Sequence, residues 1–451
     1  MKIRYKVCML FSCLFLSAFL TGCKTESMKS PEKLLEKPIT NEFNYKIYNE
    51  IRKLTPIDTT FVLPKNAIDV GRINKVDLNS NGNKEIVAFK KRTNENQGLN
   101  SIYMYIFESQ GDSIVDDSEK MVRISGDTIK YANFIDLNND GKKEIVLHIS
   151  NRGFENVYVY EYSNNVVKKK AEYNTSKYSI RLNFFDYNDD GKKECLAVLQ
   201  DLTSYDVIFS KMDVIDGDII FNKFETSKNI DSLDKVDIVN GKVAKDLNGS
   251  IFMYQSFNGS VISQVLIYKN DKFIKTLNEE NPKLKNPFFM RPQDIDGDGV
   301  LEIPKIEFKF SNNTPKESNV VTWYKWNGDQ SENSRLDISK QIFYCYDYNF
   351  KVEGPSNLNN KFFIQQKYRQ DNSVFEFSYK NSNEKLEKLF NITVIVKNGE
   401  DLDKKKSEQE NNILYEDEQY IYLYNPTNSK YLDKYKIDFN TVKKHFEIIN
   451  R

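Results

Sequence analysis

The sequence is poor in histidine. Among its 451 residues the only two histidines are His148 and His445. This scarcity excludes a metal site built from several histidines and argues against a catalytic triad with a histidine base. The chain also lacks an excess of charge of either sign, with 65 Lys and Arg residues against 65 Asp and Glu residues. We therefore expect no basic surface spread over the whole chain and no nucleic-acid partner.

Cysteine is scarce as well, and its placement argues against a fold held by disulfides. Of the five cysteines, Cys8 and Cys13 lie in an apolar N-terminal stretch and Cys23 follows it. If the Cys23 thiol carries a lipid, Cys195 and Cys345 allow at most one disulfide. The aromatic share of 13% excludes a chain that is disordered throughout. The fold must then depend on packed side chains.

The N-terminus has the features of an export signal. Three cationic residues are followed by an apolar run over residues 7–20, which is too short to span a bilayer as a helix. The sequence Leu20-Thr21-Gly22-Cys23 resembles the bacterial lipobox. That resemblance implies cleavage after residue 22, diacylglycerol on Cys23 and a location at the extracytoplasmic face of the cell membrane. The alternative is an ordinary secretory signal with an incidental cysteine. Residues 23–40 are rich in Lys, Glu and Ser and are expected to form a tether.

A repeated acidic loop runs through the middle of the chain. Its four copies begin at Asp77, Asp136, Asp186 and Asp294, so the repeat is about 50–60 residues long and the last gap spans two repeats. Residues 246–250 occupy the place of the missing copy, where we expect a turn without the acidic residues. Each repeat reads as four short strands, which is typical of a β-propeller blade.

The loop chemistry indicates Ca²⁺. Positions 1, 3 and 5 carry carboxylates or amides, position 6 is glycine, and position 9 is glutamate. Oxygen ligands in this number suit Ca²⁺, with position 7 contributing its backbone carbonyl. An EF-hand loop would need glutamate at position 12, which these loops lack. The alternative is a turn held by Asx hydrogen bonds without metal. The candidate ligands are Asp77, Asn79, Asn81, Asn83 and Glu85; Asp136, Asn138, Asp140, Lys142 and Glu144; Asp186, Asn188, Asp190, Lys192 and Glu194; and Asp294, Asp296, Asp298, Val300 and Glu302.

Carboxylate count predicts an order of affinity among the loops. The Asp294 loop offers four carboxylates, the Asp136 and Asp186 loops offer three each, and the Asp77 loop offers two. Because affinity rises with ligand charge, we expect the Asp294 loop to bind most tightly and the Asp77 loop least.

The period and the nine-residue loop between strands resemble FG-GAP/VCBS repeats, the integrin-like propeller. The resemblance covers residues 72–342. Residues 32–71 also look like the leader of VCBS-repeat lipoproteins of Bacillota, through Leu34, Leu35 and Pro38, a helix, and Val62 to Lys65. The resemblance implies a mainly β fold, a propeller of about five four-stranded blades with up to four structural Ca²⁺ ions. The fourth repeat and the Asn-rich first loop depart from the family pattern.

Two further pieces frame the predicted propeller. The piece 41–71 is expected to contain an amphipathic helix over 41–54, with Phe43, Ile47, Ile51 and Leu54 in one apolar stripe, and a strand at 60–63 that closes the last blade. Residues 343–451 are expected to form a small α+β domain that ends in a helix at 442–449. The alternative is a propeller of six or seven blades, in which residues 343–451 supply the remainder.

Four other residues have ordinary structural interpretations. Cys195 and His148 take the places of apolar strand residues in the other repeats and are expected to be packed. At least one of Trp323 and Trp326 should lie in the core, because they point to opposite strand faces. The other could contact a sugar or a protein.

These observations favour a lipid-anchored, non-catalytic binding or assembly module for an unidentified protein or glycan, with Ca²⁺ as a structural element. One alternative is an enzyme, a polysaccharide lyase or hydrolase built on the propeller. Another is a lipoprotein that chaperones an exported protein through residues 343–451.

Anchoring can be tested by Cys23→Ala. Diacylglycerol supplies two acyl chains, each contributing about 0.8 kcal/mol per buried CH₂ group, which is enough for stable anchoring. We expect the variant to leave the membrane fraction. Recovery of the variant in the membrane pellet after a high-salt wash would contradict the lipobox interpretation.

Overall fold

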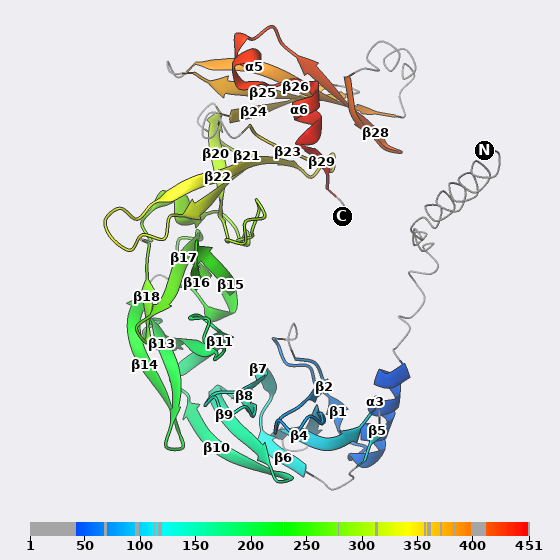
Figure 1. Ribbon diagram of the computed structural model, residues 1–451, viewed down its shortest axis with the longest axis vertical. Coiled ribbons are helices and arrows are strands. Elements are labelled where there is room, and N and C mark those ends of the chain that lie inside the picture. The colour runs from blue at the N-terminus through cyan, green and yellow to red at the C-terminus, as the bar shows by residue number, and fades with distance from the viewer. Residues whose placement is uncertain are drawn as a thin grey trace, which may run out of the picture.

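The computed structural model describes residues 42–449 except 67–69, 95–98, 112, 116–119, 229, 278, 312–313, 356–357, 359–361, 370–371, 382–384 and 398–411. The predicted signal at 1–22, Cys23 and the tether at 23–40 lie outside these residues. The described chain is mainly β. Its strands form six units that follow one another along an open arc (Figure 1). Among the described residues, no helix is both long and apolar enough to cross a membrane.

The first unit is a sheet covered by a helix. The strands are β1 (Thr60–Phe61), β2 (Ile73–Val76), β3 (Glu85–Asn94), β4 (Leu99–Gln110), β5 (Ser113–Ile114) and β6 (Lys120–Ser125). Helix α3 (Glu42–Leu54) buries Ile47 and Ile51 against the sheet, beside Ile86 and Tyr103. The predicted amphipathic stripe is thereby confirmed at these two residues. The helix covers the face of this sheet that points away from the second unit (Figure 1).

The second and third units are four-stranded antiparallel meanders. The second contains β7 (Thr128–Ile135), β8 (Glu144–Asn151), β9 (Phe154–Ser163) and β10 (Val166–Thr175). The third contains β11 (Tyr178–Phe185), β12 (Glu194–Asp201), β13 (Val207–Ile215) and β14 (Asp218–Ser227). One parallel pair, Glu172 with Asp218, joins their outer strands.

The fourth unit contains η1 (Leu233–Lys235), β15 (Val236–Ala244), β16 (Leu247–Gln255), β17 (Val261–Lys269), β18 (Lys272–Lys275), η2 (Pro282–Leu284) and β19 (Lys285–Asn286). The sequence predicted a turn over 246–250, but residues 247–250 belong to β16. Only Lys245 and Asp246 connect β15 to β16, with Asp246 at φ 56°. A Cβ atom on Gly249 would lie 2.6 Å from the Leu266 carbonyl oxygen, so glycine allows the close approach of β17.

The fifth and sixth units are sheets that share one core. The fifth contains β20 (Ile303–Ser311), β21 (Thr314–Trp326), β22 (Leu336–Cys345), β23 (Phe350–Glu353) and β29 (Phe446–Ile448). The sixth contains β24 (Phe362–Arg369), β25 (Asn372–Lys380), β26 (Leu386–Val396), β28 (Tyr420–Pro426) and β27 (Ile413–Glu416), with α5 (Lys430–Tyr435) and α6 (Phe439–Lys444) following β28. Phe343, Phe350 and Phe375 lie in the shared core.

The packing between units explains why strands such as β8 and β12 are almost continuously apolar. In β8, Ile145 and Leu147 face a core shared with the first unit, whereas Val146 faces a core shared with the third. Successive strand residues point to opposite faces, and both faces are covered by neighbouring units. This stacking of antiparallel sheets is propeller-like, with the first strands β2, β7, β11 and β15 along the inner side of the arc (Figure 1).

Three sequence-based expectations about the terminal pieces differ from the structure. Strand β1, expected to close the last blade, pairs instead with β3 of the first unit. The expected domain boundary at 342/343 falls inside β22. The helix expected at 442–449 is shorter, because α6 ends at Lys444 and residues 446–448 pair with β23 as a strand.

Candidate metal centre

Each of the four acidic loops leads directly into a strand, namely β3, β8, β12 or β20. Three of them connect β2 to β3, β7 to β8 and β11 to β12, and the fourth precedes β20. The residue at position 4 has a positive φ in every loop, and so does the glycine at position 6, with φ between 85° and 87°. L side chains rarely adopt this conformation, which accounts for the glycine.

Side-chain oxygens hold the loop backbone in the same way in all four copies. Position 1 accepts a hydrogen bond from the glycine amide at 2.8–3.0 Å. The side-chain oxygen of position 3 accepts a hydrogen bond from the backbone amide of position 5, and that of position 5 accepts one from the amide of position 7. The glutamate at position 9 accepts from the amide of position 2 at 2.8–3.1 Å.

The glutamates at position 9 are buried carboxylates. They are Glu85, Glu144, Glu194 and Glu302, with exposed fractions between 0% and 7%. Burial raises the pKa of each carboxyl above its ordinary value, and the nearby loop aspartates add to the effect. Each loop therefore concentrates negative charge around a desolvated group, which costs free energy unless a positive charge is nearby.

In three loops the aspartate at position 1 has an oxygen atom with no hydrogen-bond partner. Oδ1 of Asp77, of Asp136 and of Asp186 is buried, and no donor lies within hydrogen-bonding reach among the described residues. The other oxygen of each carboxylate is the one that accepts from the glycine amide. A buried carboxylate oxygen without a donor is unusual in a folded protein, and it is the kind of ligand that Ca²⁺ prefers. These three loops therefore fit a bound cation.

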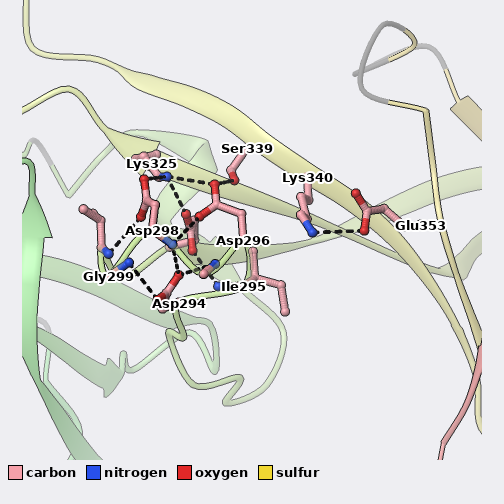
Figure 2. A network of polar contacts seen from close by, with 12 residues as sticks. Asp294, Ile295, Asp296, Asp298, Gly299, Lys325, Ser339, Lys340 and Glu353 are labelled. Carbon is pink, nitrogen blue, oxygen red and sulfur yellow. Dashed lines mark hydrogen bonds and ion pairs between the residues drawn. The ribbon is translucent and has the colours of Figure 1, made fainter. Parts of the chain in front are cut away.

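The Asp294 loop differs because it contains an ammonium group. Lys325 Nζ lies 2.8 Å from Asp296 Oδ2 and 3.0 Å from Glu302 Oε1, and it also contacts Asp298 (Figure 2). Asp294 Oδ1 accepts hydrogen bonds from the amides of residues 297 and 298. Burial alone would lower the pKa of Lys325, but the three carboxylates raise it above its usual value.

The strand register explains how Lys325 reaches the loop. Ile303 pairs with Tyr324, so Lys325 lies opposite Glu302 on the next strand. The matching position in the first unit is Glu108, which pairs with Glu85. By the same register, the matching positions in the second and third units are acidic, namely Glu161 and Asp213. The cross-strand residue is thus a carboxylate with its own lysine partner in the first three units, and it is itself a lysine in the fifth.

The carboxylate count used above did not include this cross-strand position. Asp294, Asp296 and Glu302 do converge, with ligand oxygens within 4.8 Å of one another. Their charge is already compensated by Lys325, however, so a metal ion would have to displace the ammonium. The sequence did contain a sign of this difference. The residue opposite the loop glutamate on the next strand is acidic in three units (Glu108, Glu161 and Asp213) and is Lys325 in the fifth.

The loops also connect neighbouring units. The amide of Lys143 donates to the Leu78 carbonyl at 2.9 Å, and the amide of Leu301 donates to the Lys242 carbonyl at 2.8 Å. In the fourth unit, which lacks a loop, the Asn248 side chain donates to Asp189 Oδ1 at 2.8 Å. The loops therefore lie at junctions between consecutive units, where a change in loop conformation would be transmitted to the neighbour.

The other residues considered from sequence are packed. Cys195 and Cys345 are buried free thiols, and burial raises the pKa of Cys345 to about 12. His148 is buried, with Nε2 at 2.6 Å from Glu155 Oε2. Trp323 and Trp326 are both buried, so neither is available as a surface contact.

A polar cavity of about 330 Å³ lies between the second, third and fourth units. Its lining includes Lys130 and Tyr131 of β7, Arg181 of β11 and Asp237 of β15, which are strands on the inner side of the arc (Figure 1), and we call it the inner cavity. Arg181 makes no hydrogen bond or ion pair within the described part of the chain, although Asp237 attracts it at longer range. Its guanidinium donors are therefore available to a ligand.

Comparisons with known proteins give no family. No protein-family model matches the chain, and no curated protein matches it either. Among solved structures, a protein from Lactobacillus plantarum aligns with a TM-score of 0.26 and 9% identity over 68% of this chain and 81% of its own. An exotype rhamnogalacturonan lyase aligns with a TM-score of 0.26 and 13% identity over 69% of this chain and 60% of its own. At these TM-scores neither alignment carries an argument about fold or activity.

The role of Lys325 can be tested by Lys325→Met, which keeps the side-chain length and removes the charge. We expect a loss of about 3 kcal/mol in the free energy of unfolding in a chelating buffer, because the carboxylates are left without a counter-charge. Added Ca²⁺ should restore more stability to this variant than to the wild type. Both effects can be measured by thermal unfolding.

Lys340→Met is the matched control, because Lys340 has the same exposed fraction, 25%, and pairs with Glu353 at 3.0 Å outside the loop. It should cost about 1 kcal/mol or less and leave the response to Ca²⁺ unchanged. Equal melting temperatures for both variants would contradict a special role for Lys325.

Proposed function

We propose that this protein is a membrane-anchored, extracytoplasmic binding or assembly module of the FG-GAP/VCBS type, whose propeller-like body is stabilised by Ca²⁺. The observation that carries the calcium proposal is the buried, unpartnered Oδ1 atom of Asp77, Asp136 and Asp186. Three independent copies of the same unsatisfied oxygen support a common missing ligand. Ca²⁺ would be held by the loop carboxylates and amides and would supply positive charge at the unit junctions.

The number of calcium sites is smaller in this proposal than the sequence pattern suggests. The Asp77, Asp136 and Asp186 loops are the sites, and the Asp136 and Asp186 loops should bind more tightly because they offer more carboxylates. The Asp294 loop ranks last, because Lys325 already compensates its charge.

The inner cavity around Arg181 is the proposed ligand surface. A guanidinium without a protein partner favours a ligand that carries carboxylates, such as an acidic glycan or an acidic peptide segment. The cavity lies across three units, so Ca²⁺-stabilised junctions would hold its lining residues in place. Membrane attachment through Cys23 would present this surface outside the cell.

The calcium proposal predicts stabilisation by mass action. Extracellular Ca²⁺ modules bind at about 10⁻⁴–10⁻³ M. At a free Ca²⁺ concentration about ten times Kd, each occupied loop should add about 1.4 kcal/mol to the free energy of unfolding. The double variant Asp136→Ala, Asp186→Ala should lose most of this Ca²⁺-dependent gain, as measured by thermal unfolding and calorimetric titration.

Asp216→Asn provides the control, because Asp216 lies in an exposed turn outside the four loops. It should respond to Ca²⁺ as the wild type does. The readout is the difference between calcium and chelator, which separates metal binding from the structural hydrogen bonds of the loop aspartates. A wild-type melting curve that is identical in both buffers would refute the calcium proposal.

The binding proposal can be tested on an array of neutral and acidic glycans. Arg181→Gln should weaken retention of acidic polymers by about 10-fold or more, because a charge-assisted hydrogen bond contributes about 1.5–3 kcal/mol. Arg335→Gln is the control, since Arg335 is exposed on the fifth unit and pairs with Asp337. Equal retention by wild type and Arg181→Gln would contradict the assignment of the cavity. Appearance of unsaturated uronate during incubation would favour the lyase alternative.

A further inference from the structure

A second cavity lies beside α3 in the first unit. Its volume is about 880 Å³, and it is lined by α3, the segment that follows it to Phe61, Arg72 and Lys90 of β3. The described residues that line it include four cations, Arg52, Lys53, Arg72 and Lys90, and no carboxylate. Neither the metal loops nor the inner cavity includes any of these residues.

Lys90 is the unusual member of this group. Its side chain is almost fully buried, with an exposed fraction of 2%. The ammonium donates one hydrogen bond, to Thr55 Oγ1 at 2.6 Å, and lies 5.2 Å from the centre of the Phe61 ring. It forms no ion pair within the described residues. The carboxylate that influences it most, Asp58, pairs with Arg92 at 2.7 Å.

A buried ammonium without a carboxylate is unfavourable. An ammonium has three donors, and Thr55 accepts from one of them. Burial lowers the pKa of Lys90, and the positive charge of Arg52 lowers it further. Lysine is among the residues that are almost never fully buried unless they are paired. The surrounding cations make the deficit of negative charge larger, because no carboxylate is among the described residues that line the cavity.

The other three cations are placed at the solvent side. Arg52, Lys53 and Arg72 are exposed, whereas Lys90 is enclosed. An anion that entered the cavity would therefore meet exposed charges first and the buried ammonium last. Exposed cations attract anionic ligands over several ångströms, and a desolvated ammonium binds them strongly at close range.

We propose that this cavity is a binding site for a phosphate-type oxyanion, with Lys90 as its innermost ligand and Arg52, Lys53 and Arg72 around its entrance. A phosphate group carries up to two negative charges and offers several acceptor oxygens, which matches several convergent cations and no acid. The phosphate can belong to a small soluble ester or to the head group of an anionic lipid. Ile57, whose exposed fraction is 99%, borders the same cavity and would contact the acyl region in the second case.

Calorimetric titration of the full-length chain with inorganic phosphate tests the site, with sodium chloride of equal ionic strength as the reference. We expect the wild type to bind phosphate and Lys90→Met to bind it at least ten-fold more weakly. In phosphate-free buffer the melting temperature of Lys90→Met should equal or exceed that of the wild type, because the variant no longer buries an unpaired charge. Lys46→Met, on the same helix but outside the cavity, should behave as the wild type.

A second variant guards against misfolding of the first. Arg52 is exposed, so Arg52→Gln should leave the fold intact and still weaken phosphate binding. Equal phosphate affinity for wild type, Lys90→Met and Arg52→Gln would overturn the proposal. It would also be overturned if the wild type bound no phosphate and bound phosphatidylglycerol and phosphatidylcholine vesicles equally.

Vesicles distinguish the two sources of phosphate. If the ligand is a lipid head group, wild-type protein should bind phosphatidylglycerol vesicles more tightly than phosphatidylcholine vesicles, and Lys90→Met should lose that preference. If it is a soluble ester, glycerol phosphate should bind as phosphate does, without a preference between the vesicles. Either result supports the site.

Discussion

The buried glutamate at position 9 of each loop is the interaction on which the rest of this structure depends. Its carboxylate accepts a hydrogen bond from the backbone amide of position 2. This bond fixes where the loop ends and the following strand begins. The same glutamate carries a charge into the protein, close to the aspartates that shape the loop. Loop geometry and charge compensation therefore cannot be separated. In three units the aspartate at position 1 keeps an oxygen without a hydrogen-bond donor, whereas in the fifth unit a lysine from the neighbouring strand forms an ion pair with the glutamate at position 9.

Local features were predictable from the sequence, and features that depend on strand pairing were not. The position of glycine predicts the loops, and the spacing of apolar residues predicts the strands around them and the apolar stripe of α3. Lys325 was missed because its meeting with Glu302 depends on the register of β20 and β21. The prediction that β1 closes the last blade was wrong for a related reason, because strand propensity does not specify which sheet edge a short strand joins. The terminal residues 446–448 had a helical pattern, but the free edge of β23 draws them into a sheet.

The open arc has physical consequences for its two ends. Each inner unit has both faces covered by neighbours, whereas the first and sixth units have one neighbour each. The first unit covers its outer face with α3, and this helix also brings Arg52 and Lys53 next to Lys90. The packing that protects the end of the arc therefore also creates the cationic cavity. The proposed metal loops lie at the inner junctions, so the two kinds of charged site occupy different parts of the same architecture.

The pairing of β29 with β23 affects the order in which the chain can reach its final structure. Residues 350–353 acquire their outer partner only from residues 446–448, after the whole sixth unit has been made. The first four units are built from consecutive strands, so each of them can form soon after its last strand has been synthesised. The fifth unit must wait with an unprotected edge. During folding, this unpaired edge is where another strand could add to the sheet incorrectly.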